Sequence, residues 1–241
     1  QWDESYSWAR EFIDENRRGS APKGFMDLLG VGDLVYLYVE NDQVKVDQIP
    51  QVQSSLISFN PKTGEVLSYV GGSVFNDSQF DRVRQSYPQS GSVFKPFIYA
   101  SAFNGDYNPS SLINDAPIIY EDENLETFWR PENYSGKFYG LTTLREALVQ
   151  SINIVSIKLL REIGIKKSSE TIDNFGFGIE RLPQDLSLAL GSGNFSPAEV
   201  ARGFSVFANG GMISDIHYVS QIKDKNGDII FDHSEIDVVN I

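Results

Sequence analysis

The chain contains no cysteine and only two histidines, His217 and His233, among its 241 residues. Without cysteine no disulfide can form, and the redox compartment is not indicated either way. Two histidines near the C-terminal end argue against a metal site and against a Ser-His-Asp triad. We therefore expect no metal and no cofactor, and any nucleophile in this chain needs a base other than histidine.

Basic residues are also scarce: 20 lysines and arginines stand against 33 acidic residues, for a net charge of −13. This balance argues against nucleic acid or an anionic membrane surface as the main partner. No apolar run approaches 18 residues, and the best candidate, residues 28–39, is interrupted by Asp33. We expect the chain to be soluble as given and, because it begins with Gln1 rather than methionine, to be processed or cut from something longer.

The residues that are present suffice for a core, since 41% are hydrophobic and the length allows one large domain or one domain plus a fragment. Periodicity and turn residues predict hairpins and helices without regular βαβ alternation, which favours an α+β class: a largely antiparallel sheet flanked by helices. The expected helices are 1–19, the stretch from Ser92, 142–164, 167–175 and 197–208, and the expected hairpins are 34–49, 53–70 and 218–231.

The stretch from Gly91 to Ala100 indicates a buried helix with a hydroxyl at its start and an amine one turn later. Ser92 is a suitable N-cap, and Pro96 is tolerated only near a helix start. Residues three apart share a helix face, so Ser92 and Lys95 are expected to point into one cavity. A serine beside a desolvated lysine is one way to obtain a nucleophile without histidine.

A serine three residues before a lysine occurs three times in this chain, so the spacing alone is weak evidence. The pair that begins with Ser20 spans Pro22 in a loop. The pair that begins with Ser220 lies in a predicted strand, where such positions face opposite sides. Only Ser92 and Lys95 have a helical context. The alternative, non-catalytic interpretation of this pair is an N-cap serine and a lysine that extends its amine to solvent.

The run from Gln89 to Tyr99, QSGSVFKPFIY, resembles the active-site helix of penicillin-binding proteins of the bifunctional class A type. The resemblance covers most of residues 50–232, because further stretches match the family in order. These are NPKTGEVL (60–67), WRPEN (129–133), LREAL (144–148), FGFG (175–178), LALGSG (188–193) and VFANGG (206–211). It implies a DD-peptidase or β-lactamase-like fold.

The family's second motif, Ser-x-Asn, has three candidates in this chain: Ser58-Phe59-Asn60, Ser151-Ile152-Asn153 and Ser192-Gly193-Asn194. The family pattern requires the motif after the nucleophile, which removes the first candidate. The stretch LVQSINIVS (148–156) resembles the second motif directly, whereas Ser192 lies in a separate stretch that we expect to be a structural loop. Ser151 and Asn153 are therefore our choice, against the alternative of a cap serine and a surface asparagine.

The third motif, Lys-Thr-Gly, occurs once, at Lys62-Thr63-Gly64, yet this copy precedes the nucleophile and sits between two predicted strands. We interpret Lys62 as a turn residue, not a catalytic one. The family's catalytic copy follows the second motif on a strand, so its expected position is beyond Ile241. We expect residues 50–241 to be the N-terminal portion of the transpeptidase domain, and the isolated chain to bind penicillin weakly or not at all.

Residues 1–49 resemble the linker region of the Gram-negative 1a subtype, where an OB-like accessory domain precedes the catalytic strands. The matching stretches are WAR (8–10), VGDLV (31–35) and QIPQVQ (48–53). We expect only the later part of such a domain here. The family's glycosyltransferase domain and membrane anchor would lie N-terminal, which implies the periplasmic face of the bacterial inner membrane.

The resemblance implies acyl transfer in cell-wall synthesis. Lys95, kept neutral by burial and neighbouring positive charge, would take the proton of Ser92. Ser92 would attack the carbonyl of a D-Ala-D-Ala stem peptide and release D-Ala. Ser151 would relay a proton to the leaving amine, and Asn153 would bind the substrate amide. The amine of a second stem peptide would then resolve the acyl-enzyme, and a β-lactam would leave an acyl group that is released slowly.

Two other classes of function remain open. A β-lactamase or penicillin sensor shares the Ser-x-x-Lys geometry, although no glutamate in a family-matching position suggests a deacylating base. A non-catalytic module for wall binding or scaffolding is also compatible with a chain that lacks the third motif. Labelling by a fluorescent penicillin separates the three.

Overall fold

The computed structural model describes residues 6–48, 52–76, 78–121, 128–233 and 239–240. The chain divides into two compact units, Gln1–Gln53 and Ser54–Ile241. Each unit is described by itself. Within the described residues, no helix is long and apolar enough to cross a membrane.

The first unit is built from two hairpins and a short 3₁₀ turn, Phe25–Asp27. Strands β1 (Phe12–Asp14) and β2 (Arg17–Arg18) form one hairpin, and β3 (Tyr36–Glu40) and β4 (Gln43–Asp47) form the other. Tyr6 is buried, packs edge-on against Phe25 at 5.3 Å, and accepts a hydrogen bond from the Val46 N–H at 3.0 Å.

The helix predicted over residues 1–19 is wrong for the part that the structure describes, and residues 1–5 lie outside it. The carboxylate of Asp14 accepts hydrogen bonds from the Asn16 N–H at 2.9 Å and from Arg17 Nε at 2.8 Å. An aspartate that binds the backbone two residues later stabilises a turn at the expense of a helix. Phe12 and Ile13, two of the apolar residues that suggested a helical face, therefore lie on strand β1 of a hairpin.

In the second unit the strands pair two by two, and every pair among the described residues is antiparallel. The pairs are β5 (Leu56–Phe59) with β6 (Val66–Val70), β7 (Leu112–Asp115) with β10 (Gly140–Thr143), β8 (Tyr120–Glu121) with β9 (Phe128–Trp129), β11 (Met212–Ile213) with β14 (Val239–Asn240), and β12 (Gln221–Lys223) with β13 (Ile229–Asp232). The hairpins predicted at 34–49, 53–70 and 218–231 are thus confirmed.

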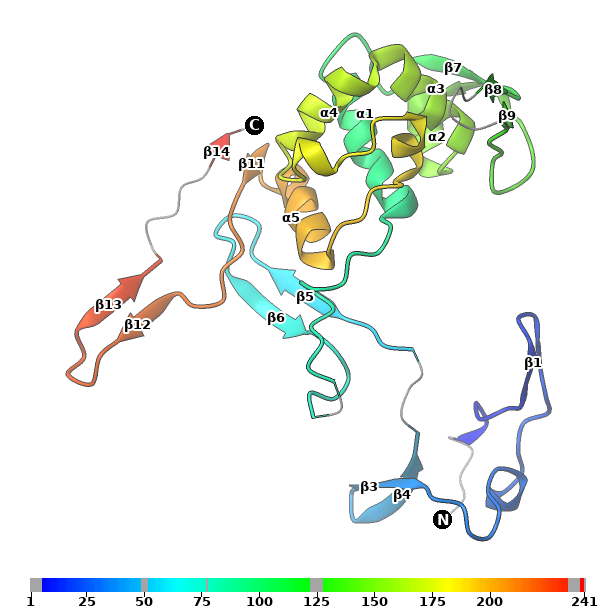
Figure 1. Cartoon of the computed structure of the whole chain (residues 1–241), viewed down its shortest axis with the longest axis vertical. Coiled ribbons are helices and arrows are strands. Elements are labelled where there is room, and N and C mark those ends of the chain that lie inside the picture. Colours follow the sequence, from blue (N-terminus) through cyan, green and yellow to red (C-terminus); the bar gives the residue numbers. More distant parts are fainter. Residues whose placement is uncertain (1–5, 49–51, 77, 122–127, 234–238, 241) are drawn as a thin grey trace. The chain divides into compact units, whose positions relative to one another are not determined.

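Five helices surround the core of this unit in the described part of the chain: α1 (Lys95–Phe103), α2 (Leu144–Val149), α3 (Asn153–Ile163), α4 (Ile165–Asp173) and α5 (Pro197–Ala208). Short 3₁₀ segments cover Gly91–Phe94, Ile179–Arg181 and Leu186–Leu190. Figure 1 shows α1 running among α2, α3 and α4, and α1 contacts all three. The helix predicted over 142–164 is divided into α2 and α3.

Aromatic side chains form the centre of the core. The ring of Phe97 contacts five others at centroid distances of 4.8 to 5.5 Å: Phe94, Phe175, Phe177, Phe204 and Phe207. Phe94 and Phe97 are almost fully buried. Aromatic packing of this density anchors the helix that starts at Lys95 and keeps its first turn rigid.

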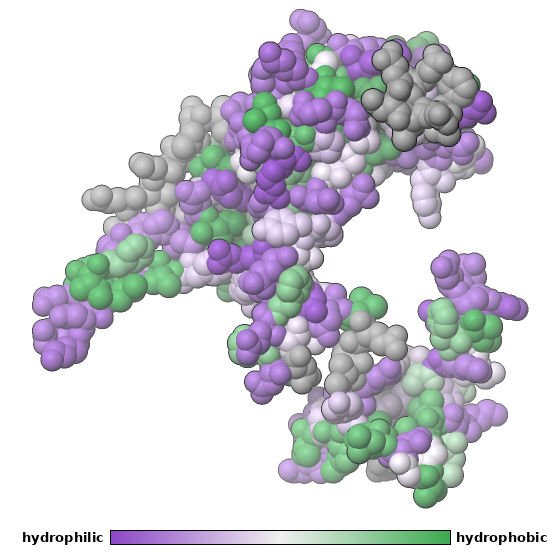
Figure 2. Space-filling model, in the orientation of Figure 1, coloured by the Kyte–Doolittle hydropathy of each residue, from purple (hydrophilic) through white to green (hydrophobic). Residues whose placement is uncertain are grey.

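The β12–β13 hairpin exposes apolar side chains, which appear as a green patch in Figure 2. Ile222, Ile229, Ile230 and Phe231 are between 44% and 67% exposed. A lone two-stranded ladder has little stability of its own, so this hairpin is held mainly by its attachment to the rest of the unit.

Candidate active site

Ser92 lies on the 3₁₀ turn Gly91–Phe94, which leads directly into α1. The structure differs from the N-cap prediction: Ser90 is the residue before the turn, α1 begins at Lys95, and Ser92 accepts the Lys95 N–H with its backbone carbonyl. Side chains three apart on a 3₁₀ turn are eclipsed. Ser92 and Lys95 therefore share one side of the turn, with Ser92 exposed and Lys95 only 1% exposed.

The amine of Lys95 makes three hydrogen bonds, all to the segment between α2 and the first residue of α3. Its Nζ lies 2.7 Å from the Ser151 carbonyl oxygen, 3.0 Å from Ser151 Oγ and 2.7 Å from Asn153 Oδ1. The structure thus joins Lys95, Ser151 and Asn153, which sequence analysis selected from motifs more than fifty residues apart. Ser92 sits one turn before the amine.

Burial lowers the pKa of Lys95 to about 8. The expected contribution of a neighbouring positive charge is not found among the described residues. Nζ donates to all three of these oxygens when the amine is charged, and a neutral amine can still donate to two of them and keep its lone pair free. The site is therefore compatible with an amine that takes up and releases a proton near neutral pH.

Ser151 has a left-handed backbone, with φ of +54°. It follows α2 and closes it: the Ser151 N–H bonds the Leu148 carbonyl at 3.1 Å, and the Ile152 N–H bonds the Ala147 carbonyl at 2.8 Å. This pair of bonds is the Schellman arrangement, in which the left-handed position is usually glycine. Serine at this position is strained, and its carbonyl and hydroxyl both lie against Lys95.

Asn153 is the first residue of α3, and both ends of its amide are bound. Oδ1 accepts from Lys95, while Nδ2 donates to the Glu132 carbonyl at 2.9 Å. Asn133 then accepts the Asn153 N–H at 3.0 Å. Glu132 and Asn133 belong to the stretch WRPEN (129–133), and the sequence alone predicts no role for them. No local signal could have found it, since the contact joins a loop to a helix start.

The loop at 191–194 packs against the turn that carries Ser92. Gly91 N–H donates to the Gly191 carbonyl at 2.9 Å, and Ser90 Oγ lies 3.2 Å from the carbonyl oxygens of Gly191 and Gly193. Gly191 has φ of +72°, and a Cβ there would lie 1.9 Å from the Gly91 carbonyl oxygen. Only glycine permits this close approach.

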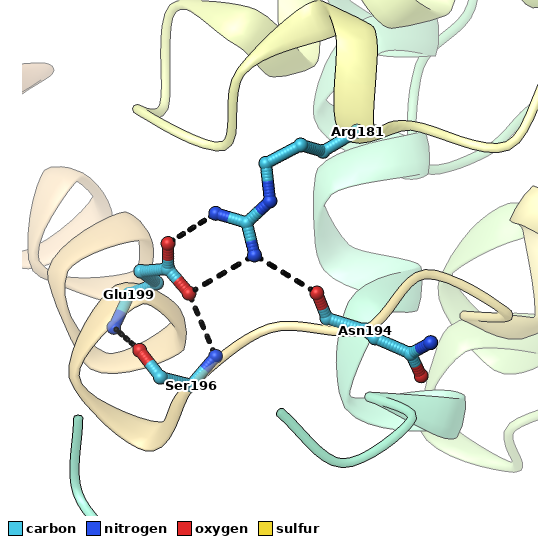
Figure 3. Close-up of polar contacts among 4 residues, drawn as sticks. All are labelled: Arg181, Asn194, Ser196 and Glu199. Carbon is cyan, nitrogen blue, oxygen red and sulfur yellow. Dashed lines mark hydrogen bonds and ion pairs between the residues drawn. The ribbon is translucent and has the colours of Figure 1, made fainter. Parts of the chain in front are cut away.

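A cluster around Arg181 holds the other end of this loop (Figure 3). Arg181 forms an ion pair with Glu199 and donates to the Asn194 carbonyl at 3.0 Å. Ser196 and Glu199 exchange side chain to backbone bonds in a complete capping box at the start of α5. The hydrogen bond to Glu199 raises the pKa of Arg181. This cluster ties the loop to α5 and thereby supports the Ser92 turn.

The other serines and lysines considered above lie elsewhere in the chain. Lys62 is in the turn between β5 and β6, where the Lys62 carbonyl accepts from Ser214 Oγ at 3.0 Å. Ser192 bonds Ser187 at 2.6 Å. Ser20 follows β2 in the first unit, and Ser220 precedes β12. None of these residues contacts Lys95 through a hydrogen bond in the described part of the chain.

The two histidines contact each other through their rings. Their rings lie 3.8 Å apart and nearly perpendicular. Among the described residues, no group of three or more metal-binding side chains comes together.

The Penicillin binding protein transpeptidase domain family matches residues 55–241, and the Penicillin-binding protein OB-like domain family matches residues 2–52. Penicillin-binding protein 1A of Pseudomonas aeruginosa is 41% identical over 95% of this chain. The crystal structure of Penicillin-Binding Protein 1A from Haemophilus influenzae superposes with a TM-score of 0.79 at 33% identity and covers 86% of this chain. The PonA1 protein from Mycobacterium tuberculosis in complex with penicillin V shares the fold, with a TM-score of 0.67 at 21% identity over 78% of this chain.

These relatives are longer than the chain described here. The chain spans 28% of the Pseudomonas aeruginosa protein, 31% of the Haemophilus influenzae structure and 53% of the PonA1 structure. The matches confirm the predicted fold class, a transpeptidase fold related to β-lactamases with an N-terminal OB-like β domain.

Proposed function

Since the chain belongs to the class A penicillin-binding protein transpeptidase family, of the 1A-like type, we propose that it carries part of a serine D,D-transpeptidase site with Ser92 as the nucleophile. The observation that carries this proposal is the buried Lys95 amine, bound by Ser151 and Asn153 one turn away from an exposed serine. We also propose that residues 1–49 are part of the OB-like accessory region, and that residues 50–241 are the N-terminal portion of the transpeptidase domain.

The proposed first step is acylation. The neutral Lys95 amine takes the proton of Ser92 Oγ, and the oxygen attacks the carbonyl between the two D-alanines of a stem peptide. The Ser92 backbone N–H helps to hold the developing oxyanion. The proton taken up by Lys95 passes through Ser151 Oγ to the leaving amine, so that the peptide C–N bond breaks and D-Ala departs. Asn153 retains one Nδ2 hydrogen for the substrate amide, since the other is bound by Glu132.

The proposed second step transfers the acyl group to another strand. The amine of a second stem peptide attacks the ester carbonyl, its proton passes to Ser92 Oγ through Lys95, and the new amide is the cross-link. A β-lactam follows the first step only: its ring C–N bond opens, and the acyl group stays on Ser92. We further propose that the full-length protein acts at the periplasmic face of the bacterial inner membrane, as the resemblance to the family implies.

The proposal is tested with a fluorescent penicillin on a full-length protein that carries this sequence, and in parallel on the 241-residue chain. We expect stable labelling of the full-length protein, and loss of all label in Ser92→Ala. Ser192→Ala is the matched control, because Ser192 lies in the loop that packs against the Ser92 turn and its hydroxyl bonds Ser187, with no hydrogen bond to Lys95 in the described residues. This variant should keep its label.

Other outcomes decide against the proposal. Rapid loss of the label from wild type indicates a β-lactamase-like hydrolase. A wild-type protein that is folded and takes no label indicates a non-catalytic module. Labelling that persists in Ser92→Ala assigns the nucleophile to another residue.

A further inference from the structure

A buried pair, Asp115 and Asn133, lies behind the segment that holds Lys95. Asp115 ends strand β7 and is 1% exposed, and Asn133 lies in the loop after β9 and is 6% exposed. Asn133 Nδ2 is 2.9 Å from both carboxylate oxygens of Asp115 and 2.9 Å from the Lys137 carbonyl. The Tyr139 N–H also donates to Asp115, at 2.9 Å. The carboxylate is thus buried and bound by neutral donors.

The other end of the Asn133 amide caps helix α3. Its Oδ1 accepts the N–H of Asn153 at 3.0 Å and the N–H of Ile154 at 3.1 Å. The first N–H groups of a helix have no partner within the helix, and the residue before it usually supplies one. Here that residue is Ile152, which has no side-chain acceptor. Asn133 supplies the missing cap from 20 residues upstream.

Asp115 determines which way the Asn133 amide faces. A carboxylate can only accept hydrogen bonds, so the NH₂ group of Asn133 must face it and the carbonyl oxygen must face the helix. With an apolar or donor group in place of the carboxylate, the amide could turn over and present its NH₂ to the N–H groups of α3. The negative charge also lies near the positive end of the helix dipole, which is favourable.

The same loop orients the side chain of Asn153. Its Nδ2 binds the Glu132 carbonyl, and Oδ1 is therefore turned toward Lys95. Glu132 therefore fixes the side-chain amide of Asn153, and Asn133 fixes its backbone N–H. Ser151, two residues before it, is placed by the same constraint.

We propose that Asp115 and Asn133 are positioning residues, which lock the start of α3 and thereby hold Ser151 and Asn153 against the Lys95 amine. The positioning is a property of the fold; only its effect on catalysis rests on the proposed function. Without the cap, the first turn of α3 frays and water reaches Lys95. The amine then loses its desolvation and two of its fixed partners.

A charge-swap cycle tests this inference: Asp115→Asn, Asn133→Asp and the double variant. Asp115→Asn keeps one acceptor oxygen but sets its NH₂ group against that of Asn133. Asn133→Asp sets carboxylate against carboxylate and removes the donor to the Lys137 carbonyl. In the double variant, Asn at 115 donates to Asp at 133, whose other oxygen can accept from α3. We expect each single variant to raise the pKa of Lys95 from about 8 by about one unit, measured by NMR titration of Lys95 Cε. Penicillin labelling of the full-length protein should slow at least about tenfold. The double variant should restore part of the labelling rate and part of the Lys95 pKa, because the Lys137 carbonyl still lacks the donor that Asn133 Nδ2 supplies.

Asn209→Asp is the matched control. Asn209 is also a buried asparagine, 5% exposed, and it follows the last residue of α5. Its Nδ2 donates to the Met212 carbonyl. It should lower stability and leave the Lys95 titration unchanged. Hydrogen exchange of the wild-type chain adds a test that needs no variant, since the amides of Asn153 and Ile154 should be protected.

Three results would overturn the inference: folded single variants with an unchanged Lys95 titration, a folded double variant without recovery, or unprotected amides at 153 and 154 in wild type. If wild type takes no penicillin, the proposed function fails. The Lys95 titration in the 241-residue chain then still decides whether Asp115 and Asn133 position this segment.

Discussion

At the scale of single residues, the environment of Lys95 predicts a pH dependence. Burial lowers its pKa to about 8, so about one amine in eleven is neutral at pH 7 and about ten in eleven at pH 9. If the neutral amine is the base, penicillin labelling of Ser92 should become about tenfold faster between these values. The rate is measured from the time course of fluorescent labelling in a full-length protein that carries this sequence. Lys95→Arg, which stays charged, should remain unlabelled throughout the range; a flat profile for wild type would exclude Lys95 as the base.

Ser151 combines a strained backbone with a functional contact, and two substitutions separate these effects. Ser151→Gly suits the left-handed φ of +54°, whereas Ser151→Ala keeps the strain. We expect the glycine variant to be about 1 kcal/mol more stable than the alanine variant in urea unfolding. Both variants lack the hydroxyl that lies 3.0 Å from Lys95, and both should be labelled more slowly by penicillin. Equal stability of the two variants would show that the strain at Ser151 is negligible.

At the scale of elements, local signals predicted α5 well and α2–α3 incompletely. The helix expected at 197–208 is found at Pro197–Ala208, because Ser196 caps it, Pro197 suits its first position and two glycines end it. The division of 142–164 was missed, since α2 and α3 bury apolar residues in the same core and the periodicity continues across both. What ends α2 is the left-handed backbone of Ser151, and serine is not a usual stop signal.

In the candidate site too, local sequence predicted some residues but not the contacts between distant segments. Helical context and the resemblance to the family selected Ser92, Lys95, Ser151 and Asn153. The structure places the last three in hydrogen-bonding contact, and the catalytic roles of all four stay predictions. The role of Asp115 could not be predicted, because its hydrogen-bond partner Asn133 lies in a separate loop that only the folded structure brings against the end of β7. Contacts between loops distant in the sequence leave no periodic pattern.

Two chain segments pack closely at Gly91 and Gly191, so adding one methyl group at Gly191 should greatly lower the free energy of unfolding. Gly191→Ala places a Cβ 1.9 Å from the Gly91 carbonyl oxygen at a left-handed φ of +72°. We expect a loss of about 3 kcal/mol in the free energy of unfolding, and displacement of the Ser92 turn. Gly210→Ala is the control, because its φ is +63° and its Cβ would meet nothing within 4 Å. It should cost only about 1 kcal/mol. Similar losses at both positions would contradict the proposed close approach.

At the scale of the whole molecule, the two units differ in how much apolar surface they bury. The hydrophobic core of the second unit consists of residues between Phe94 and Ile213. In the first unit, Tyr6 is the only buried residue among those described, while Val31 and Leu34 are completely exposed. Short chains with so little burial are marginal or unstable alone. The described part of the first unit therefore has little hydrophobic core.

This difference leads to a prediction for the separated units. A chain of residues 54–241 should keep a cooperative thermal transition within about 2 °C of the 241-residue chain, because removing the first unit takes nothing from the core. A chain of residues 1–53 should show no cooperative transition by calorimetry or circular dichroism. A Trp8→Ala substitution in the 241-residue chain is a useful control, since this exposed side chain belongs to the first unit and should leave the main transition unmoved. A clear fall in the midpoint on removing residues 1–53 would show instead that the two units unfold together, and that the OB-like region stabilises the core that carries Ser92.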